Sequence, residues 1–158
     1  MKQKNLIALI ACIAIPVLTG ALAGFATSSN RDPWYANLDK PWFNPPGWIF
    51  GPVWTLLYIL MGISLFMIWK QPGSKERSTG LRLFALQLVL NFAWSFIFFY
   101  FHNPGLALLE ILVLWLVILL MIRSFYRLNH LATYLQIPYQ AWVSFATVLN
   151  ASIWYLNR

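Results

Sequence analysis

The sequence is poor in charged residues and in cysteine. Only 9% of its 158 residues are Asp, Glu, Lys or Arg, whereas a soluble domain has about 25%. So few charges cannot cover the surface of a soluble globule, and a hydrophobic content of 60% excludes a disordered chain. The single cysteine, Cys12, excludes a disulfide framework and a cysteine-based zinc site. The basic residues form no cluster of the kind that binds nucleic acid, so we expect no nucleic-acid partner.

The sequence has long hydrophobic runs instead. Five of them, at about 5–26, 48–69, 82–101, 104–122 and 132–156, are long enough to cross a membrane, because a bilayer core of about 30 Å needs about 20 helical residues. The runs do not alternate between apolar and polar residues, so strands are not expected. Residues 1–158 are therefore predicted to form a single all-α membrane domain, a bundle of five transmembrane helices.

The first run permits two further interpretations. Lys2 and Lys4 precede an apolar stretch that ends in Ala21-Leu22-Ala23, a pattern typical of a signal peptide, and its cleavage would leave four spans. Gly20 and Gly24 form a small-residue pair that suits close helix packing, within one chain or between two. The alternative for this pair is that glycine is simply common in membrane helices.

The connection between the first two runs, residues 27–47, is long and carries no net charge. It is rich in proline and aromatic residues, namely Pro33, Trp34, Tyr35, Pro41, Trp42, Phe43, Pro45 and Pro46. Long loops in compact domains are usually lids, binding loops or disordered segments. Disordered segments contain few aromatic residues, so this composition predicts an ordered lid or binding loop.

The positive charges predict the orientation in the membrane. With five spans, most of the 11 Lys and Arg residues fall on one side: Lys2, Lys4, Lys70, Lys75, Arg77, Arg82, Arg123 and Arg127. The other side has Arg31, Lys40 and Arg158. The positive-inside rule then places the N-terminus inside and the long loop and the C-terminus outside. The short tails and the absence of a transit peptide predict a bacterial cell membrane.

Polar and aromatic residues of several runs lie at matching depths below the long loop. Trp54, Glu110 and Asn150 each lie about six residues from the loop side, or ~9 Å, and Asn91 and Ala146 about ten residues, or ~15 Å. Helical spacing places further residues on the same faces: Gln87, Trp94 and Ser95 with Asn91, Tyr139 and Trp142 with Asn150, and Tyr58 with Trp54. These faces predict a cavity for a flat, largely apolar ligand.

Simpler explanations exist for several of these residues. An interfacial belt explains the tryptophans near the ends of the runs, Trp34, Trp42, Trp48, Trp69 and Trp154. Trp115 is expected to face lipid or the core. Asn91 and Asn150 also fit hydrogen bonds between helices, and Glu110 fits either a structural acceptor or a ligand contact. His102 and His130 lie outside the runs, so we expect no axial ligand for haem iron, and no metal cluster or nucleophile–base pair is present.

Three groups of residues resemble the motifs of a known family. The first spans the loop and the second run, with Trp34-Tyr35, Leu38, Lys40-Pro41, Asn44-Pro45-Pro46 and Trp54. The second is Gln87-Leu88, Asn91 and Trp94-Ser95, and the third is Pro138-Tyr139, Trp142 and Phe145 to Asn150. In this order they resemble the translocator protein family, also called the tryptophan-rich sensory protein or peripheral benzodiazepine receptor family. The resemblance covers nearly the whole chain.

The resemblance implies a five-helix membrane bundle, often dimeric, with a pocket beneath the first loop for porphyrins and benzodiazepine-type ligands. Residue by residue, it places Tyr35, Pro45, Trp54, Asn91, Trp94, Trp142 and Ala146 at pocket positions. Trp54 and Trp142 match the tryptophans linked to light-dependent breakdown of protoporphyrin in bacterial relatives. Animal members carry a cholesterol motif with a tyrosine directly after the Leu-Asn pair, where this chain has Ala151, so we do not expect sterol binding.

We therefore predict a stress-related sensory membrane protein that binds a tetrapyrrole such as protoporphyrin IX, with no covalently bound cofactor. The predicted ligand-binding residues are Tyr35, Pro45, Trp54, Tyr58, Asn91, Trp94, Glu110, Tyr139, Trp142, Ala146 and Asn150. One alternative is an enzyme that degrades porphyrin in the light, with Trp54 and Trp142 as catalytic residues. Another is a transporter of porphyrins or other small apolar molecules, although the sequence lacks the inverted repeats of secondary carriers.

Overall fold

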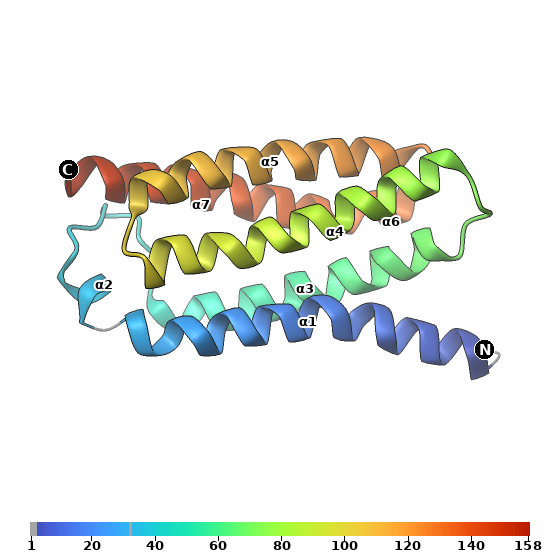
Figure 1. Cartoon of the computed structure of the whole chain (residues 1–158), viewed down its shortest axis with the longest axis horizontal. Helices are drawn as coiled ribbons and strands as arrows, with labels where there is room; N and C mark the ends of the chain where they lie inside the picture. The colour runs from blue at the N-terminus through green and yellow to red at the C-terminus, as the bar shows by residue number, and fades with distance from the viewer. Residues whose placement is uncertain (1–2, 32) are drawn as a thin grey trace.

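The computed structural model describes residues 3–31 and 33–158. Within them, every regular element is helical: α1 (Gln3–Arg31), α2 (Trp34–Asn37), α3 (Gly47–Trp69), α4 (Lys75–Ser95), the π-helix η1 (Phe96–Tyr100), α5 (Pro104–Tyr126), α6 (His130–Tyr134) and α7 (Ile137–Leu156). The long helices α1, α3, α4, α5 and α7 run side by side as one elongated bundle (Figure 1). The prediction of an all-α bundle is confirmed.

Polar side chains fix the starts of several helices. The Ser74 hydroxyl accepts a hydrogen bond from the Arg77 amide at the start of α4, and the Asn103 side chain accepts one from the Leu106 amide at the start of α5. Asn129 caps α6 in the same way, through the Ala132 amide. Such caps satisfy helix N–H groups that otherwise have no partner.

The helices differ in extent from the hydrophobic runs. Helix α4 begins at Lys75 rather than near residue 82, because the cap at Ser74 lets polar residues form its first turns. Helix α5 continues to Tyr126, beyond the predicted end near residue 122. Helix α7 begins at Ile137 rather than near residue 132, because the separate short helix α6 (His130–Tyr134) precedes it. The predicted loop 27–47 also contains the end of α1 and the short helix α2. Hydrophobicity marks only the part of a helix that faces lipid or the core, so it cannot locate polar helix ends.

Four of the described helices are long and apolar enough to cross a membrane: the stretches Gln3–Phe25, Gly47–Trp69, Lys75–Tyr100 and Pro104–Tyr126. Helix α7 has 20 residues but is not among them. It carries polar residues on successive turns, including Gln140, Ser144, Thr147 and Asn150. Two of these bond to other helices: the Trp115 Nε1 donates to the Ser144 Oγ at 2.7 Å, and the Trp94 Nε1 donates to the Asn150 Oδ1 at 3.0 Å. Helix α7 packs mainly against α5 and exposes residues such as Val148 on its outer side. Trp115 of α5 packs against the core.

The two ends of the bundle differ. The described N-terminus, the α3–α4 turn and the α5–α6 turn lie at one end, and α2, its loop and the C-terminus lie at the other (Figure 1). The first end carries most of the cations that predicted the orientation, such as Lys4, Lys70 and Arg127, whereas Lys2 lies outside the described residues. This arrangement agrees with an odd number of spans. Which end faces the cell interior stays a prediction.

Helix α1 packs along α3 through glycine contacts. Gly62 of α3 lies so close to Ile13 and Cys12 of α1 that an added Cβ would overlap the Ile13 backbone. Gly20 of α1 lies in the same way against the Tyr58 ring, whereas nothing lies near the Cβ position of Gly24. Of the two glycines in the predicted small-residue pair, Gly20 therefore serves packing within the chain.

We expect the substitution Gly62→Ala to destabilise the bundle, because the added methyl group meets the α1 backbone at Ile13. Overpacking of this kind costs about 1–3 kcal/mol. The measurement is thermal unfolding in detergent, followed by circular dichroism. Gly51→Ala is the matched control on the same helix, because its added methyl group has nothing within 4 Å. Equal melting temperatures for Gly62→Ala and the parent would contradict this account of the α1–α3 contact.

Candidate ligand-binding site

A cavity of about 420 Å³ lies at the loop end of the bundle. Its walls come from α1, α3, the junction of α4 with η1, and α7, and residues of α2 and the following loop cover it. Helix α1 contributes mainly small residues, among them Gly20, Ala21 and Gly24, which leave space that larger side chains would fill. The volume is within the range of small-molecule pockets, about 300–1,000 Å³.

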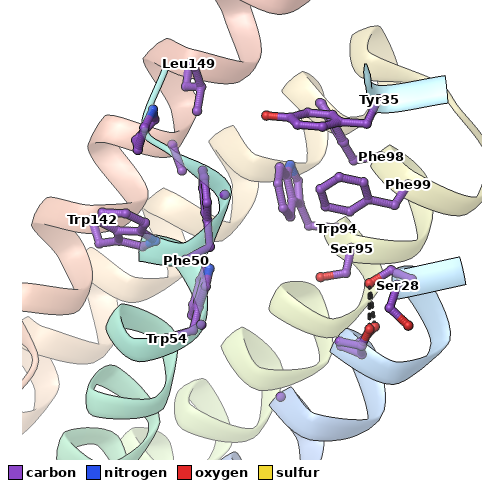
Figure 2. Close-up of a pocket in the computed structure, with 18 of the residues that line it drawn as sticks. Ser28, Tyr35, Phe50, Trp54, Trp94, Ser95, Phe98, Phe99, Trp142 and Leu149 are labelled. Carbon is purple, nitrogen blue, oxygen red and sulfur yellow. Dashed lines mark hydrogen bonds between the residues drawn. The ribbon is translucent and has the colours of Figure 1, made fainter. Parts of the chain in front are cut away.

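One wall of the cavity consists of aromatic rings from α3 and α7. Trp54 and Trp142 lie with their ring centroids 6.5 Å apart and their planes at 87°, and Phe50 lies edge-on to Trp142 at 5.9 Å. Trp54 also stacks on Tyr58 at 5.4 Å. Figure 2 shows Phe50, Trp54 and Trp142 on one side of the cavity and Trp94, Phe98 and Phe99 on the other. The space between them therefore has aromatic rings on two sides.

The opposite wall forms where α4 passes into the π-helix η1. Trp94 stacks on Phe98 at 5.2 Å and meets Phe99 edge-on at 6.0 Å, and all three rings line the cavity. The wider turn of a π-helix changes which side chains share a face, and such turns are frequent at functional sites. The Trp94 Nε1 donates to the Asn150 Oδ1 at 3.0 Å, and the Asn150 Nδ2 donates to the Pro104 carbonyl at 2.8 Å. These bonds fix the Trp94 indole against α7 and α5.

The lid consists of α2 and residues 38–46, and it is attached to the bundle at several points. The Trp34 ring stacks on His102 at 4.4 Å. The Asn157 side chain accepts a hydrogen bond from the Asp39 amide at 3.0 Å and donates one to the Asp39 carbonyl at 2.9 Å. Within the lid, the Tyr35 hydroxyl donates to the Asn44 Oδ1 at 3.2 Å, and both residues line the cavity. The sequence-based prediction of an ordered loop over the site agrees with these contacts.

A chain of hydrogen bonds joins α3, α4 and α7 directly beneath the cavity. The Tyr58 hydroxyl donates to the Asn91 Oδ1 at 2.6 Å, the Asn91 Nδ2 donates to the Tyr139 hydroxyl at 3.2 Å, and the Tyr139 hydroxyl donates to the Gln87 Oε1 at 2.8 Å. All four side chains are buried. Only Tyr58 reaches the cavity. The chain thus forms the support beneath the cavity floor.

The structure brings most of the predicted site residues to this cavity. Tyr35, Pro45, Trp54, Tyr58, Trp94, Trp142, Ala146 and Asn150 line it. Asn91 and Tyr139 lie beneath it in the buried chain, and Glu110 lies on α5, which contributes no lining residue. Both carboxyl oxygens of Glu110 are buried without a hydrogen-bond partner among the described residues. Depth predicted Glu110 as a ligand contact, helical spacing predicted Tyr139, and both of these together with the resemblance predicted Asn91. Neither depth nor spacing within one helix tells which side of the bundle a side chain faces.

Several residues that line the cavity were not predicted from the sequence. Phe98 and Phe99 both line the cavity because of the π-helical turn, which spacing for an ordinary helix does not predict. The small residues of α1 recur at helical spacing, from Val17 through Gly20 and Gly24 to Thr27 and Ser28. This helical spacing of small residues on one side of α1 could have predicted that α1 forms a wall of the cavity.

The chemistry of the lining limits what it can bind. None of the described lining residues is charged, and none is His, Cys or Met. In the part of the chain that the structure describes, no group of His, Cys, Asp or Glu is placed to hold a metal ion. The polar groups that do line the cavity are hydroxyls and amides, such as Ser95, Asn44 and Asn150. This arrangement suits a flat, largely apolar molecule.

The sequence matches known proteins over nearly the whole chain. A model of the TspO/MBR family matches residues 12–156. The chain is 40% identical to the tryptophan-rich protein TspO of Archaeoglobus fulgidus over 153 residues, which are 97% of this chain and 99% of the relative. It is 39% identical to the protein of the same name from Chlorobaculum tepidum, with 98% and 99% covered. It is 38% identical to the translocator protein of Bos taurus, with 91% and 86% covered.

We expect Tyr139→Phe to destabilise the bundle by about 1–3 kcal/mol, because it leaves buried polar atoms of Asn91 and Gln87 without a partner. The measurement is again thermal unfolding in detergent. Tyr155→Phe is the control, because that tyrosine is exposed near the end of α7. If Tyr139→Phe has the same melting temperature as the parent and Tyr155→Phe, the buried hydrogen bonds do not stabilise the bundle beneath the cavity.

Proposed function

The chain belongs to the TspO/MBR family of membrane proteins, and from this we propose that it binds a tetrapyrrole in the cavity beneath the lid. Metal-free protoporphyrin IX is the ligand that fits the lining best. The observation that carries the proposal is the pair of facing aromatic walls, Trp54 and Trp142 opposite Trp94 and Phe98, around a cavity with no charged lining residue among those described. A flat macrocycle offers π-faces to such rings.

The residues of the chain have separate tasks in this proposal. The indoles of Trp54 and Trp142 contact the macrocycle, and Trp94, held by Asn150, contacts its other side. Tyr35, Asn44 and Pro45 of the lid exclude water above it. The described lining residues include no His, Cys or Met, and the hydroxyls of the two lining tyrosines, Tyr35 and Tyr58, are bonded to Asn44 and Asn91. These observations support the free porphyrin rather than its iron complex as the ligand.

The protein is proposed to act as a sensor that reports porphyrin level, in a prokaryotic cell membrane with the lid and the C-terminus outside. The prokaryotic relatives support that membrane, and the distribution of cations supports the orientation. A homodimer stays a prediction from the resemblance. Gly20 would not contribute to its interface, because this glycine already packs against Tyr58.

Light-dependent porphyrin breakdown is the second candidate function. The observation in its favour is that Trp54 and Trp142 lie 6.5 Å apart and both line the cavity. An illuminated porphyrin produces reactive oxygen species, and indoles beside it are oxidisable groups. This function requires the same binding step, so one titration tests both candidates.

We expect protoporphyrin IX to quench the tryptophan fluorescence of the purified protein saturably in the dark. Trp54→Phe and Trp142→Phe are each expected to weaken binding about threefold to tenfold, because an aromatic contact of this kind contributes about 0.5–1.5 kcal/mol. Trp69→Phe is the matched control, since Trp69 ends the same helix as Trp54 but lies outside the cavity. Quenching that never saturates, or that is equally weakened by Trp69→Phe, would sink the proposed site.

Illumination of the saturated samples separates binding from breakdown. A new absorption band that forms in the parent and is lost in both cavity variants would make the light-driven reaction the primary function. An unchanged porphyrin spectrum would leave a binding and sensory protein. Equal reaction rates in the parent, Trp54→Phe and Trp142→Phe would show that these indoles are not catalytic.

We also expect the lid to slow ligand release. Asn157→Ala removes both hydrogen bonds to Asp39. Two such bonds together contribute about 1–3 kcal/mol, so release of protoporphyrin should become about fivefold to a hundredfold faster. Stopped-flow dilution measures the rate. Ser152→Ala, an exposed change on the same helix, serves as the control. An unchanged rate in Asn157→Ala would mean that ligand leaves without opening of the lid at Asp39.

A further inference from the structure

The cavity lining poses a problem for the acidic side chains of the proposed ligand. Protoporphyrin carries two carboxylates, and the described lining residues include no Lys, Arg or His to pair with them. A carboxylate buried without a partner is strongly disfavoured. The acidic edge of the macrocycle must therefore project out of the lining, toward a cation at the loop end.

Lys40 is a cation of the lid in a suitable place. Its Nζ lies 5.0 Å from the centroid of the Tyr35 ring, and Tyr35 lines the cavity. The side chain is half-buried rather than extended into solvent. Next to it, the Tyr35 hydroxyl is bonded to Asn44, a second lining residue. The ammonium group thus contacts a ring that itself lines the cavity.

The hydrogen bonds of Lys40 hold the ammonium group in place and leave it one donor. Its Nζ donates to the Ala36 carbonyl at 3.1 Å and to the Leu38 carbonyl at 2.8 Å. A lysine ammonium group has three N–H donors, so two bonds to carbonyls leave one N–H for a further acceptor. Two neutral carbonyls do not neutralise the positive charge. A carboxylate would supply both the missing acceptor and the counter-charge.

Other described cations are less well placed. The Arg158 guanidinium, also at the loop end, lies over the Tyr155 ring at 4.2 Å, and Tyr155 does not line the cavity. Lys70 lies over the Phe66 ring at 5.4 Å, but at the opposite end of α3 from the cavity. Lys70 therefore has the same local chemistry as Lys40, a lysine over an aromatic ring, without the cavity.

We propose that Lys40 forms a carboxylate-binding subsite at the lid, which orients an acidic tetrapyrrole with its apolar edge in the cavity and its acidic edge toward the loop end. The inference rests on the proposed function and adds a specificity to it. The site prefers flat macrocycles that carry carboxylates on one edge over neutral macrocycles of the same shape. Lys40 is a positioning residue in this arrangement, because it fixes which edge of the ligand enters.

The experiment compares protoporphyrin IX with its dimethyl ester, which has the same macrocycle and no carboxylate charge. Both are titrated in the dark against the parent, Lys40→Gln, Lys40→Arg and Lys70→Gln. Gln keeps N–H donors for the carbonyls of Ala36 and Leu38 but removes the charge, whereas Arg keeps the charge. Lys70→Gln removes the same charge at the other end of the molecule.

We expect the parent to bind the diacid more tightly than the ester by about threefold to fivefold, the size of a partly exposed ion pair. Lys40→Gln should abolish this preference by weakening the diacid alone, while Lys40→Arg and Lys70→Gln keep it. Raising the salt concentration should reduce the preference in the parent. If Lys40→Gln weakens both ligands equally, Lys40 only holds the lid together, and the subsite is overturned.

The remaining outcomes separate the subsite from the proposed function. Equal affinity of the parent for diacid and ester would overturn the subsite and leave porphyrin binding in place. A preference for the diacid that survives in Lys40→Gln would place the anionic edge elsewhere and also overturn it. Failure of the parent to bind either porphyrin would overturn the proposed function itself.

Discussion

The structure depends on one constraint: a bilayer offers polar side chains no partners, so they must find them inside the bundle. The hydrogen bonds from Tyr58 through Asn91 and Tyr139 to the Gln87 Oε1 supply such partners and tie α3, α4 and α7 together, although the Gln87 Nε2 is buried without a partner among the described residues. Because these bonds work only in one arrangement of the three helices, they also fix which faces meet. The cavity lies immediately above this level, where the rings of Trp54 and Tyr58 stack.

Above these buried hydrogen bonds, the helices do not close on one another, because small residues of α1 and the π-helical turn η1 leave space between them. Aromatic rings line that space and the lid covers it. Trp34 of the lid stacks on His102, and Asp39 is hydrogen-bonded to Asn157, so the position of the lid depends on the connection between η1 and α5 and on the end of α7. Rigid packing below and polar attachments above thus define one site in a chain that has few charges.

Most of the fold was predictable from the sequence. Long hydrophobic runs predict helices, and the structure has a long helix at each of the five runs. The candidate site was predictable in part. Trp54, Trp94 and Trp142 share depth and helical faces, and they line one cavity. Glu110 matches them in depth but lies on α5, which contributes no lining residue. Depth alone does not tell which helices surround a cavity. The helix ends at Lys75 and Ile137 depended on caps and polar turns that hydrophobicity does not mark.

By itself, the sequence determined the helical class, the aromatic character of the site and the end of the bundle at which it lies, since these follow from composition, spacing and charge along one chain. Only the tertiary structure decided that Asn91 and Tyr139 support the cavity rather than line it, that Phe98 and Phe99 turn into it, and that Lys40 lies over Tyr35. Each of these depends on contacts between helices or on a local departure from α-helical geometry. Periodicity within one segment carries no information about either.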